Sequence, residues 1–301
     1  MAAPGSGSKV FLDYDQQGLD DAYDQSVYAP NRQQLLARIA HASELVREHL
    51  GAPLRFAYGP TPIEQLDVYR TPRPNAPINV YIHGGAWRAG RARDYGYPAE
   101  MFVRAGAHYV VPDFDNVEEA GGSLFVMADQ VRRAVAWVHR NAARFGADAT
   151  RLYVSGSSSG AHLGGVVATT DWQRDFALPA DTVKGYTLTS GMYDLRGPRL
   201  SKRSRYVKFT DEMEAALSPQ RHLDAIGAPI VLVYGTLETP EFQRQSRDFA
   251  AALRRAGKEV QLVVAEGYNH FEVAETIGDP AGPVGRAVLA QMRLGGAPAA
   301  G

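Results

Sequence analysis

The sequence contains no cysteine among its 301 residues. Disulfides, a cysteine nucleophile and thiolate metal ligands are therefore excluded. Net charge is nearly absent as well, at −1, so no overall electrostatic field attracts nucleic acid or an anionic membrane. No apolar run approaches the length of a membrane span. We therefore expect a soluble cytoplasmic protein that binds neither nucleic acid nor membranes.

Several ligand-binding signatures are missing too. The chain has no His-Glu-x-x-His helix and no carboxylate cluster that would hold a metal, and no Gly-x-x-x-x-Gly-Lys loop for a nucleotide. Residues 1–8 are small and polar, unlike a secretory signal, and residues 5–8 are typical of a linker. We therefore expect a small-molecule substrate, no metal and no cofactor. The oligomeric state stays open, and a homodimer is compatible with the sequence.

Hydrophobic residues make up 45% of the chain, and their pattern predicts one α/β domain over residues 31–294. Apolar runs predict strands at 54–58, 66–69, 78–82, 107–111, 152–155, 185–190, 230–234 and 260–265. Helical patterns predict helices at 32–50, 99–105, 124–145, 240–256 and 283–294. Strands that alternate with helices indicate a mainly parallel, twisted sheet of about eight strands with helices on both faces. The first two strands flank a Gly-Pro-Thr-Pro turn, which favours an antiparallel pair at an edge.

Three segments stand apart from this pattern. Residues 1–30 are acidic and rich in tyrosine, and we expect an arm that lies over the domain near the pocket; a solvated extension is the alternative. Residues 196–217 form a loop excursion or small cap, and residues 295–301 a flexible tail. The cap segment is basic. A basic run this short is usually a solvated surface, whereas the alternative is a cavity mouth that favours anionic substrates. Its basic residues are Arg196, Arg199, Lys202, Arg203, Arg205 and Lys208.

The clearest chemical signal is Gly156-x-Ser158-x-Gly160, which lies between an apolar strand and a helix-like segment. In that context the pattern is typical of a nucleophile elbow, where a serine sits at the apex of a tight turn. Glycine is needed on either side because a Cβ would keep the strand and the helix apart. Ser158 is therefore the predicted nucleophile.

A serine hydroxyl needs a base to take its proton and an acid to hold that base in one tautomer. His270 is the one histidine that follows a C-terminal strand, so it is the predicted base. The acid should follow the strand at 230–234. Glu238 lies in that loop and is preferred, but Glu241, just inside the next helix, remains the alternative.

Acyl transfer also needs donors for a developing oxyanion. Gly84 and Gly85 directly follow the strand at 78–82, and we expect their backbone N–H groups to serve together with that of Ser159. We expect His83 to brace this loop. His162, one helical turn beyond the nucleophile, is interpreted as a buried packing residue.

These motifs resemble the α/β-hydrolase superfamily, in the His-Gly-Gly-x-Trp branch that includes the arylformamidases (kynurenine formamidases) and is related to the hormone-sensitive-lipase-like esterases. The matching segments are residues 83–87, 156–163, 190–195, 240–242, 245–249 and 269–271, across about two thirds of the chain. The resemblance implies the fold and the serine, acid, histidine triad. Family members usually carry aspartate where Glu238 stands; glutamate is one methylene longer and serves as the acid in other serine hydrolases.

Ligands of an open α/β sheet bind outside the carboxyl ends of its strands. The residues that follow the strands are therefore the predicted substrate contacts, joined by one tyrosine of the arm. They are Trp87, Phe114, Asn116, Met192, Tyr193, Phe271 and Tyr14. Together they predict a compact pocket for a flat ring.

We therefore expect a serine hydrolase that cleaves a small aryl amide or aryl ester through an acyl-enzyme. A general short-chain carboxylesterase or lactonase is one alternative. A ligand-binding protein that keeps the hydrolase fold without turnover is an alternative from another class.

Overall fold

A computed structural model describes residues 8–294, so the predicted tail and most of the predicted linker lie outside the described residues. Within this range the sheet has eight strands in the order β1-β2-β4-β3-β5-β6-β7-β8. The strands are β1 (Leu54–Ala57), β2 (Gln65–Tyr69), β3 (Ala76–Ile82), β4 (His108–Pro112), β5 (Ala147–Ser157), β6 (Tyr186–Thr189), β7 (Ile230–Gly235) and β8 (Val260–Ala265). All eight predicted strands are present, with ends that shift by a few residues.

The sheet is parallel from β4 to β8 and antiparallel at one edge. β1 and β2 pair antiparallel, as the Gly-Pro-Thr-Pro turn predicted, and β2 is also antiparallel to β4. The pairs β3–β4, β3–β5, β5–β6, β6–β7 and β7–β8 are parallel. The carboxyl ends of β3, β5, β6, β7 and β8 therefore lie at one end of the sheet, where every predicted catalytic loop begins.

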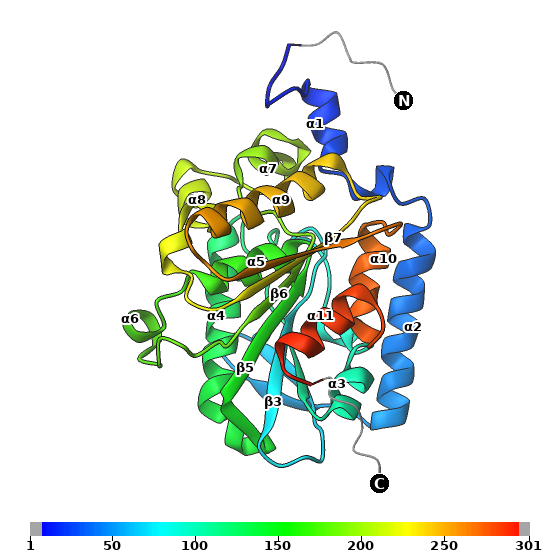
Figure 1. Ribbon diagram of the computed structural model, residues 1–301, viewed down its shortest axis with the longest axis vertical. Helices are drawn as coiled ribbons and strands as arrows, with labels where there is room; N and C mark the ends of the chain where they lie inside the picture. The colour runs from blue at the N-terminus through cyan, green and yellow to red at the C-terminus, as the bar shows by residue number, and fades with distance from the viewer. Residues whose placement is uncertain (1–7, 295–301) are drawn as a thin grey trace.

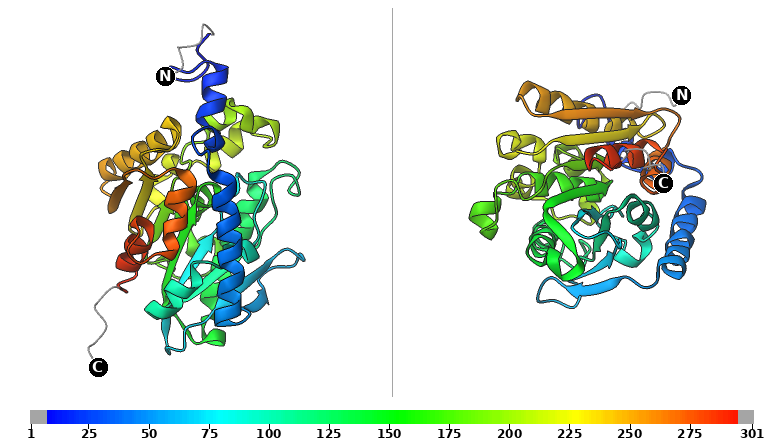
Figure 2. Two further views of the ribbon diagram at one scale, coloured as in Figure 1. Left: turned by 90° about the vertical axis from the view of Figure 1, so that its right-hand side faces the viewer. Right: turned by 60° about the horizontal axis from the view of Figure 1, so that its bottom comes forward.

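Helices cover both faces of the sheet (Figure 1). One face packs against α4 (Leu124–Asn141), α5 (Ser159–Ala168) and α9 (Pro240–Arg255). The other packs against α3 (Ala99–Ala105), α10 (His270–Glu275) and α11 (Pro283–Gln291). The long helix α2 (Arg32–Leu50) runs beside α10, as Figure 2 shows. None of the helices in residues 8–294 combines the length and the apolarity needed to cross a bilayer.

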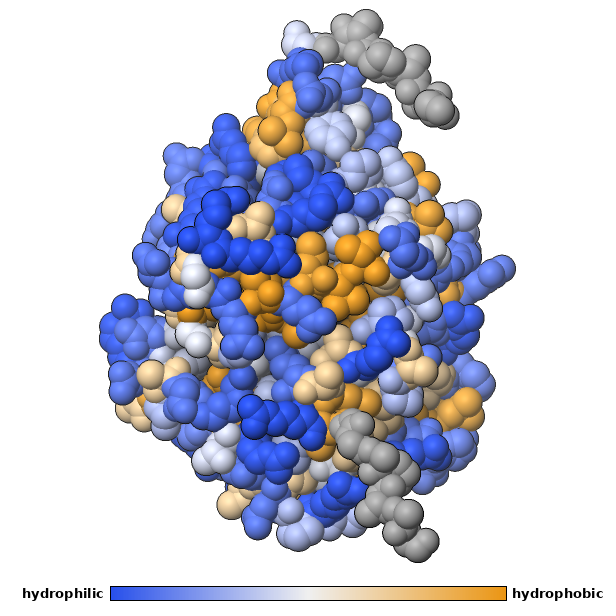
Figure 3. Space-filling view, viewed as in Figure 1, coloured by the Kyte–Doolittle hydropathy of each residue, from blue (hydrophilic) through white to orange (hydrophobic). Residues whose placement is uncertain are grey.

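The alternation of side chains along each strand explains the two layers. In β7, Ile230 and Leu232 point into the cluster beneath α9, whereas Val231 and Val233 point into the cluster beneath α11. All four are buried, and full burial of such a side chain contributes about 1.5–3 kcal/mol. The edge strand β8 is less covered. Apolar surface gathers over it in Figure 3, and Val264 is 42% exposed.

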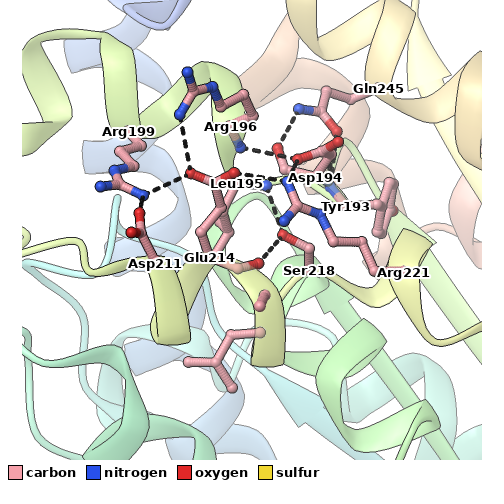
Figure 4. A network of polar contacts seen from close by, with 12 residues as sticks. Tyr193, Asp194, Leu195, Arg196, Arg199, Asp211, Glu214, Ser218, Arg221 and Gln245 are labelled. Atoms are coloured by element: carbon pink, nitrogen blue, oxygen red, sulfur yellow. Dashed lines mark hydrogen bonds and ion pairs between the residues drawn. The ribbon is translucent and has the colours of Figure 1, made fainter.

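The segment after β6 forms a small cap of short helices above the sheet. It contains α7 (Arg196–Leu200), a 3-10 turn (Lys202–Arg205) and α8 (Asp211–Ala216). Figure 4 shows the polar network that anchors it, centred on the buried carboxylate of Glu214. Arg221, Arg199 and Arg196 approach this carboxylate at 2.7, 3.0 and 3.6 Å. The Ser218 hydroxyl donates to the backbone carbonyl of Glu214 at 2.6 Å, so the residues that follow α8 are also hydrogen-bonded to Glu214.

The N-terminal segment contains α1 (Gln16–Ala22), which packs beside α9 and the cap. The backbone N–H of Lys202 donates to the Asp20 carboxylate at 2.5 Å. The Thr239 hydroxyl donates to the carbonyl of Ala22 at 2.6 Å. The described part of the arm is therefore hydrogen-bonded to both the cap and the loop after β7.

The Glu214 network generates a stability prediction. Glu214→Gln should lower the free energy of unfolding at pH 7 by about 1–3 kcal/mol, because three guanidinium groups lose a buried charged acceptor. Burial raises the pKa of Glu214, but the hydrogen bonds from Arg221 and Arg199 outweigh burial and hold that pKa below 4.5. The carboxylate therefore stabilises the fold above pH 4.5, and its contribution is lost as the pH falls through its folded-state pKa.

Urea unfolding of the wild type and the variant at several pH values measures this effect. The difference between the two proteins should be largest near neutral pH and shrink in acid. Glu212→Gln is the matched control, since Glu212 is an exposed residue of the same helix. A Glu214→Gln penalty that is the same at neutral and acid pH would contradict the assignment.

Candidate active site

The nucleophile turn has the strained backbone that the glycine pattern predicted. Ser158, between β5 and α5, has φ 56° and ψ −123°. A Cβ on Gly160 would lie 2.0 Å from the carbonyl oxygen of Ile82, and one on Gly156 would lie 2.7 Å from the carbonyl oxygen of Gly160. These clashes show why glycine stands on both sides of Ser158: β3, β5 and α5 approach too closely there for any side chain.

The three predicted triad residues lie in one hydrogen-bonded chain. His270 Nε2 is 2.9 Å from Ser158 Oγ, and His270 Nδ1 is 2.7 Å from Glu238 Oε2. The imidazole and the carboxylate are both nearly inaccessible, at 5% and 2% exposure, whereas Ser158 is half-buried and faces the cavity. In the neutral imidazole, Nδ1–H donates to Glu238, which leaves the Nε2 lone pair free to accept the serine proton.

The Glu238 carboxylate has further partners that the sequence analysis did not identify. Oε1 accepts hydrogen bonds from the Ser190 hydroxyl at 2.5 Å and from the Gly235 N–H at 2.7 Å. Gln25 of the arm lies 3.4 Å from Oε2, the oxygen that faces His270. Ser190 opens the Ser-Gly-Met-Tyr-Asp-Leu segment that matched the family, and it directly follows β6. Its position directly after a strand was the sequence signal that could have identified Ser190 as a partner of the acid.

The competing acid, Glu241, lies elsewhere. Its carboxylate accepts two hydrogen bonds from Arg244, at 2.8 and 2.7 Å, and one from the Tyr23 hydroxyl at 2.8 Å. This arrangement ties α9 to the arm. The structure therefore brings Glu238, rather than Glu241, to the imidazole of His270.

The loop after β3 lies against the nucleophile. Gly84 and Gly85 both line the cavity beside Ser158. A Cβ on Gly84 would lie 2.9 Å from the carbonyl oxygen of Ser157 and 3.2 Å from the Ser158 Cβ, so only glycine fits. Among residues 8–294, no acceptor takes the backbone N–H of either glycine. Ser159 is the first residue of α5, so its N–H lacks an intrahelical partner as well. These three donors remain the predicted oxyanion site.

Two other histidines lie nearby, and both are buried packing residues. His162 accepts a hydrogen bond from Trp87 Nε1 at 3.2 Å, and its Nε2 lies 2.8 Å from the carbonyl of Leu217. Burial lowers the pKa of His162 to about 4, so it stays neutral at ordinary pH. His83 lies between the rings of Phe114 and Tyr95, with centroids 4.3 and 5.1 Å away, and its Nδ1 lies 2.9 Å from the carbonyl oxygen of Gly84 in the glycine loop.

A cavity of about 510 Å³ opens in front of Ser158. The ends of β3 and β5 contribute Tyr81 and Ser157, and most of the remaining wall comes from the arm, α2, the glycine loop, the cap and α10. The aromatic lining consists of Tyr23, Tyr81, Tyr95, Tyr97, Tyr206 and Phe271. At its base the Tyr81 hydroxyl lies 2.8 Å from Ser157 Oγ, and burial raises the pKa of Tyr81 to about 12. The cavity is thus compact and aromatic, although mostly through residues that the sequence analysis did not select.

Of the seven predicted substrate contacts, Phe271 alone lines this cavity. The oxyanion-loop residue Trp87 is 2% exposed because its indole is turned inward onto His162. Phe114 is stacked on His83, and Asn116 accepts the N–H groups of Glu118 and Glu119 in a turn. The prediction that these side chains face the substrate is therefore wrong.

The other three predicted substrate contacts do not line the cavity either. Met192 and Tyr193 are fully buried, and the Tyr193 ring stacks on Phe249 with centroids 4.4 Å apart. Tyr14 forms a backbone bridge with Phe11 in the arm and does not reach the cavity. A position just after a strand does not decide whether the next side chain turns toward the substrate or into the core.

The expectation that the basic cap segment is a solvated surface is also wrong in part. Lys202, Arg203 and Arg205 line the cavity, and Arg203 is 5% exposed.

Within residues 8–294, no group of three or more His, Cys, Asp or Glu side chains is arranged to hold a metal ion.

Comparisons with known proteins show the family to which this chain belongs. A family model described as BD-FAE matches residues 66–192. The chain is 31% identical over 229 residues to a kynurenine formamidase from Danio rerio, which covers 74% of this chain and 75% of that protein. It is 32% identical over 234 residues to a kynurenine formamidase from Salmo salar, with 75% and 77% covered.

A solved structure of esterase LipW from Mycobacterium marinum has a similar fold. The two superpose with a TM-score of 0.68 and 21% identity, over 90% of each chain. The fold, the similarity in sequence and the shared motifs lead to one conclusion. The chain belongs to the α/β-hydrolase superfamily, in its arylformamidase and hormone-sensitive-lipase-like esterase branch.

Proposed function

We propose that this chain cleaves a small aryl amide or aryl ester through an acyl-enzyme on Ser158. The observation that carries the proposal is the continuous hydrogen-bonded chain from Ser158 through His270 to Glu238 at the base of an open cavity. A serine alone is a weak nucleophile, and this arrangement supplies the base and the orienting acid that it needs.

In the first half of the reaction Ser158 Oγ attacks the substrate carbonyl while its proton passes to His270 Nε2. The negative charge that develops on the carbonyl oxygen is stabilised by the N–H groups of Gly84, Gly85 and Ser159. Glu238 stabilises the imidazolium that forms. His270 then gives the proton to the leaving amine or alcohol as its bond to the acyl carbon breaks.

In the second half a water molecule replaces the leaving group. His270 takes one proton from this water, whose oxygen attacks the acyl carbon. The Ser158–acyl bond breaks, Oγ recovers the proton from His270, and the carboxylic acid is released. The catalytic residues return to their starting protonation states, so the cycle needs no cofactor.

The cavity and the relatives support the substrate class. A volume of about 510 Å³ with six aromatic rings in the wall suits one aromatic ring and a small acyl group better than a long chain. Two relatives are named kynurenine formamidase, which supports a formyl amide as the bond that is cleaved. A short-chain carboxylesterase is the second candidate, since relatives named esterase share the fold.

The first test concerns the nucleophile. Ser158→Ala should lower kcat by about a thousandfold or more while the protein stays folded, because only binding and the oxyanion donors remain. A fluorophosphonate probe should label the wild type and not the variant. Ser157→Ala is the control, since the Ser157 hydroxyl is hydrogen-bonded to the Tyr81 hydroxyl, whereas Ser158 is the serine hydrogen-bonded to His270. Near-normal turnover in Ser158→Ala would contradict the proposal, and an unlabelled, inactive wild type would favour the binding-protein alternative.

The second test separates the two glutamates. Glu238→Gln should reduce kcat on the order of 10³–10⁴-fold with little change in substrate affinity, because the imidazole is no longer held in the productive tautomer. Glu241→Gln should instead lower the melting temperature, through the weakened pair with Arg244, and leave kcat nearly unchanged. Steady-state kinetics and thermal unfolding of both variants give the answer, and the reverse pattern would refute the assignment.

The third test concerns the substrate. We expect an aryl formamide and para-nitrophenyl esters of short acids to be hydrolysed, with kcat/KM falling as the acyl chain lengthens, because the cavity is compact. A series from acetyl to octanoyl measures this. A lactone in the same panel covers the lactonase alternative. A maximum at octanoyl would show that the cavity accepts long chains and would refute the compact-pocket interpretation.

A further inference from the structure

The cap places a buried arginine in the wall of the catalytic cavity. Arg203 lies in the 3-10 turn Lys202–Arg205 and is 5% exposed. Its guanidinium lies over the rings of Trp87 and Phe242, with centroid distances of 5.3 and 5.9 Å. A charged group at this depth ordinarily has a carboxylate partner, because burial of an unpaired charge is unfavourable.

Arg203 has no such partner. Lys202 pairs with Asp24, and Arg205 approaches Asp20 at 3.8 Å, but Arg203 forms no ion pair with any carboxylate of residues 8–294. Nη1 donates to the Tyr206 hydroxyl at 2.9 Å and Nη2 to the carbonyl of Tyr23 at 3.0 Å, while Nε is buried without an acceptor. A guanidinium has five N–H donors, so most of its hydrogen-bonding capacity is unused.

The charged side chains in the rest of the cavity wall are mostly cationic. Two carboxylates line it, Asp24 and Glu118, and both are already paired, with Lys202 and Arg88. The cationic side chains in the lining are Arg32, Arg88, Lys202, Arg203 and Arg205. The cavity therefore has a net positive wall. Among the described residues neither Arg32 nor Arg203 pairs with a carboxylate, but Arg32 is exposed and lies over the Phe271 ring, whereas Arg203 is buried.

We infer that Arg203 is a specificity residue that binds a carboxylate on the aromatic leaving group of the substrate. This inference rests on the proposed function, in which the acyl part is small and uncharged, so the anionic group has to be on the ring. A planar guanidinium presents donors that match the two oxygens of a carboxylate. The Tyr23 carbonyl and the Tyr206 hydroxyl hold that plane in place from the arm and the cap.

Matched substrates test the inference in the intact enzyme. Formanilide is compared with its ortho, meta and para carboxylates, and phenyl acetate with the corresponding carboxyphenyl acetates. One carboxylated isomer should exceed the neutral parent in kcat/KM by about tenfold to a hundredfold, the range expected for a hydrogen bond to a charged group. Arg203→Gln should bring that ratio close to one.

Arg205→Gln is the control for charge alone. It removes the same formal charge from the same turn, but the Arg205 side chain is 78% exposed, so the preference should persist. An equal loss in both variants would mean that the cavity only attracts anions at long range. An unchanged preference in Arg203→Gln would overturn the inference.

A binding measurement separates this inference from the proposed function and does not depend on how Arg203→Gln folds. Benzoate and benzamide have nearly the same shape and differ in charge. Calorimetry with the folded Ser158→Ala protein should give a dissociation constant at least about tenfold lower for benzoate. Tighter binding of benzoate by Ser158→Ala, together with a wild type that hydrolyses none of the substrates, would support the anion site and refute the hydrolase. Hydrolysis of the neutral substrates with equal binding of the two ligands would refute the anion site alone.

Discussion

The hydrogen bond between Glu238 and His270 is the interaction on which the rest of the site depends. The carboxylate is 2% exposed, and so buried a charge persists only because the Ser190 hydroxyl, the Gly235 N–H and the imidazole satisfy its oxygens. These partners come from the ends of β6, β7 and β8. The loops after these three strands must therefore lie together before Nε2 of His270 can face Ser158. The parallel sheet positions them, since it brings the carboxyl ends of these strands to one edge.

The triad residues lie directly after strands of the sheet or in the loops that follow them, and other segments build most of the cavity around them. Tyr23 joins the arm to α9 through Glu241, and the Glu214 network anchors the cap that carries Arg203. Arg203 in turn donates to the carbonyl of Tyr23, so the arm and the cap are directly hydrogen-bonded. In the proposed function, and in the inference drawn from Arg203, catalysis and substrate selection are assigned to different parts of the chain. The proposed catalytic residues lie at or after strand ends, and the proposed selection uses side chains on short helices and turns.

This division explains what the sequence could predict. The strand pattern and the spacing of Gly156 and Gly160 are local signals in the sequence. The glycine spacing predicted Ser158, and the strand pattern predicted the loop that carries His270. The direction of a side chain is decided by packing between distant segments. Trp87 turns onto His162 and Met192 into the core for that reason, and the position after a strand did not reveal it. The burial of Arg203 likewise depends on the arm and on α9, which lie about 180 residues before it and about 40 after it.

The most direct test of the central claim, that Ser158 carries the acyl group, is to trap the acyl-enzyme. The enzyme is mixed with para-nitrophenyl acetate, quenched with acid during the pre-steady state, digested, and mapped by peptide mass spectrometry. The account predicts a burst of one nitrophenolate per active site and a single acetyl group on Ser158. Acetylation of a different residue, or steady turnover with no acylated peptide at any time, would contradict it.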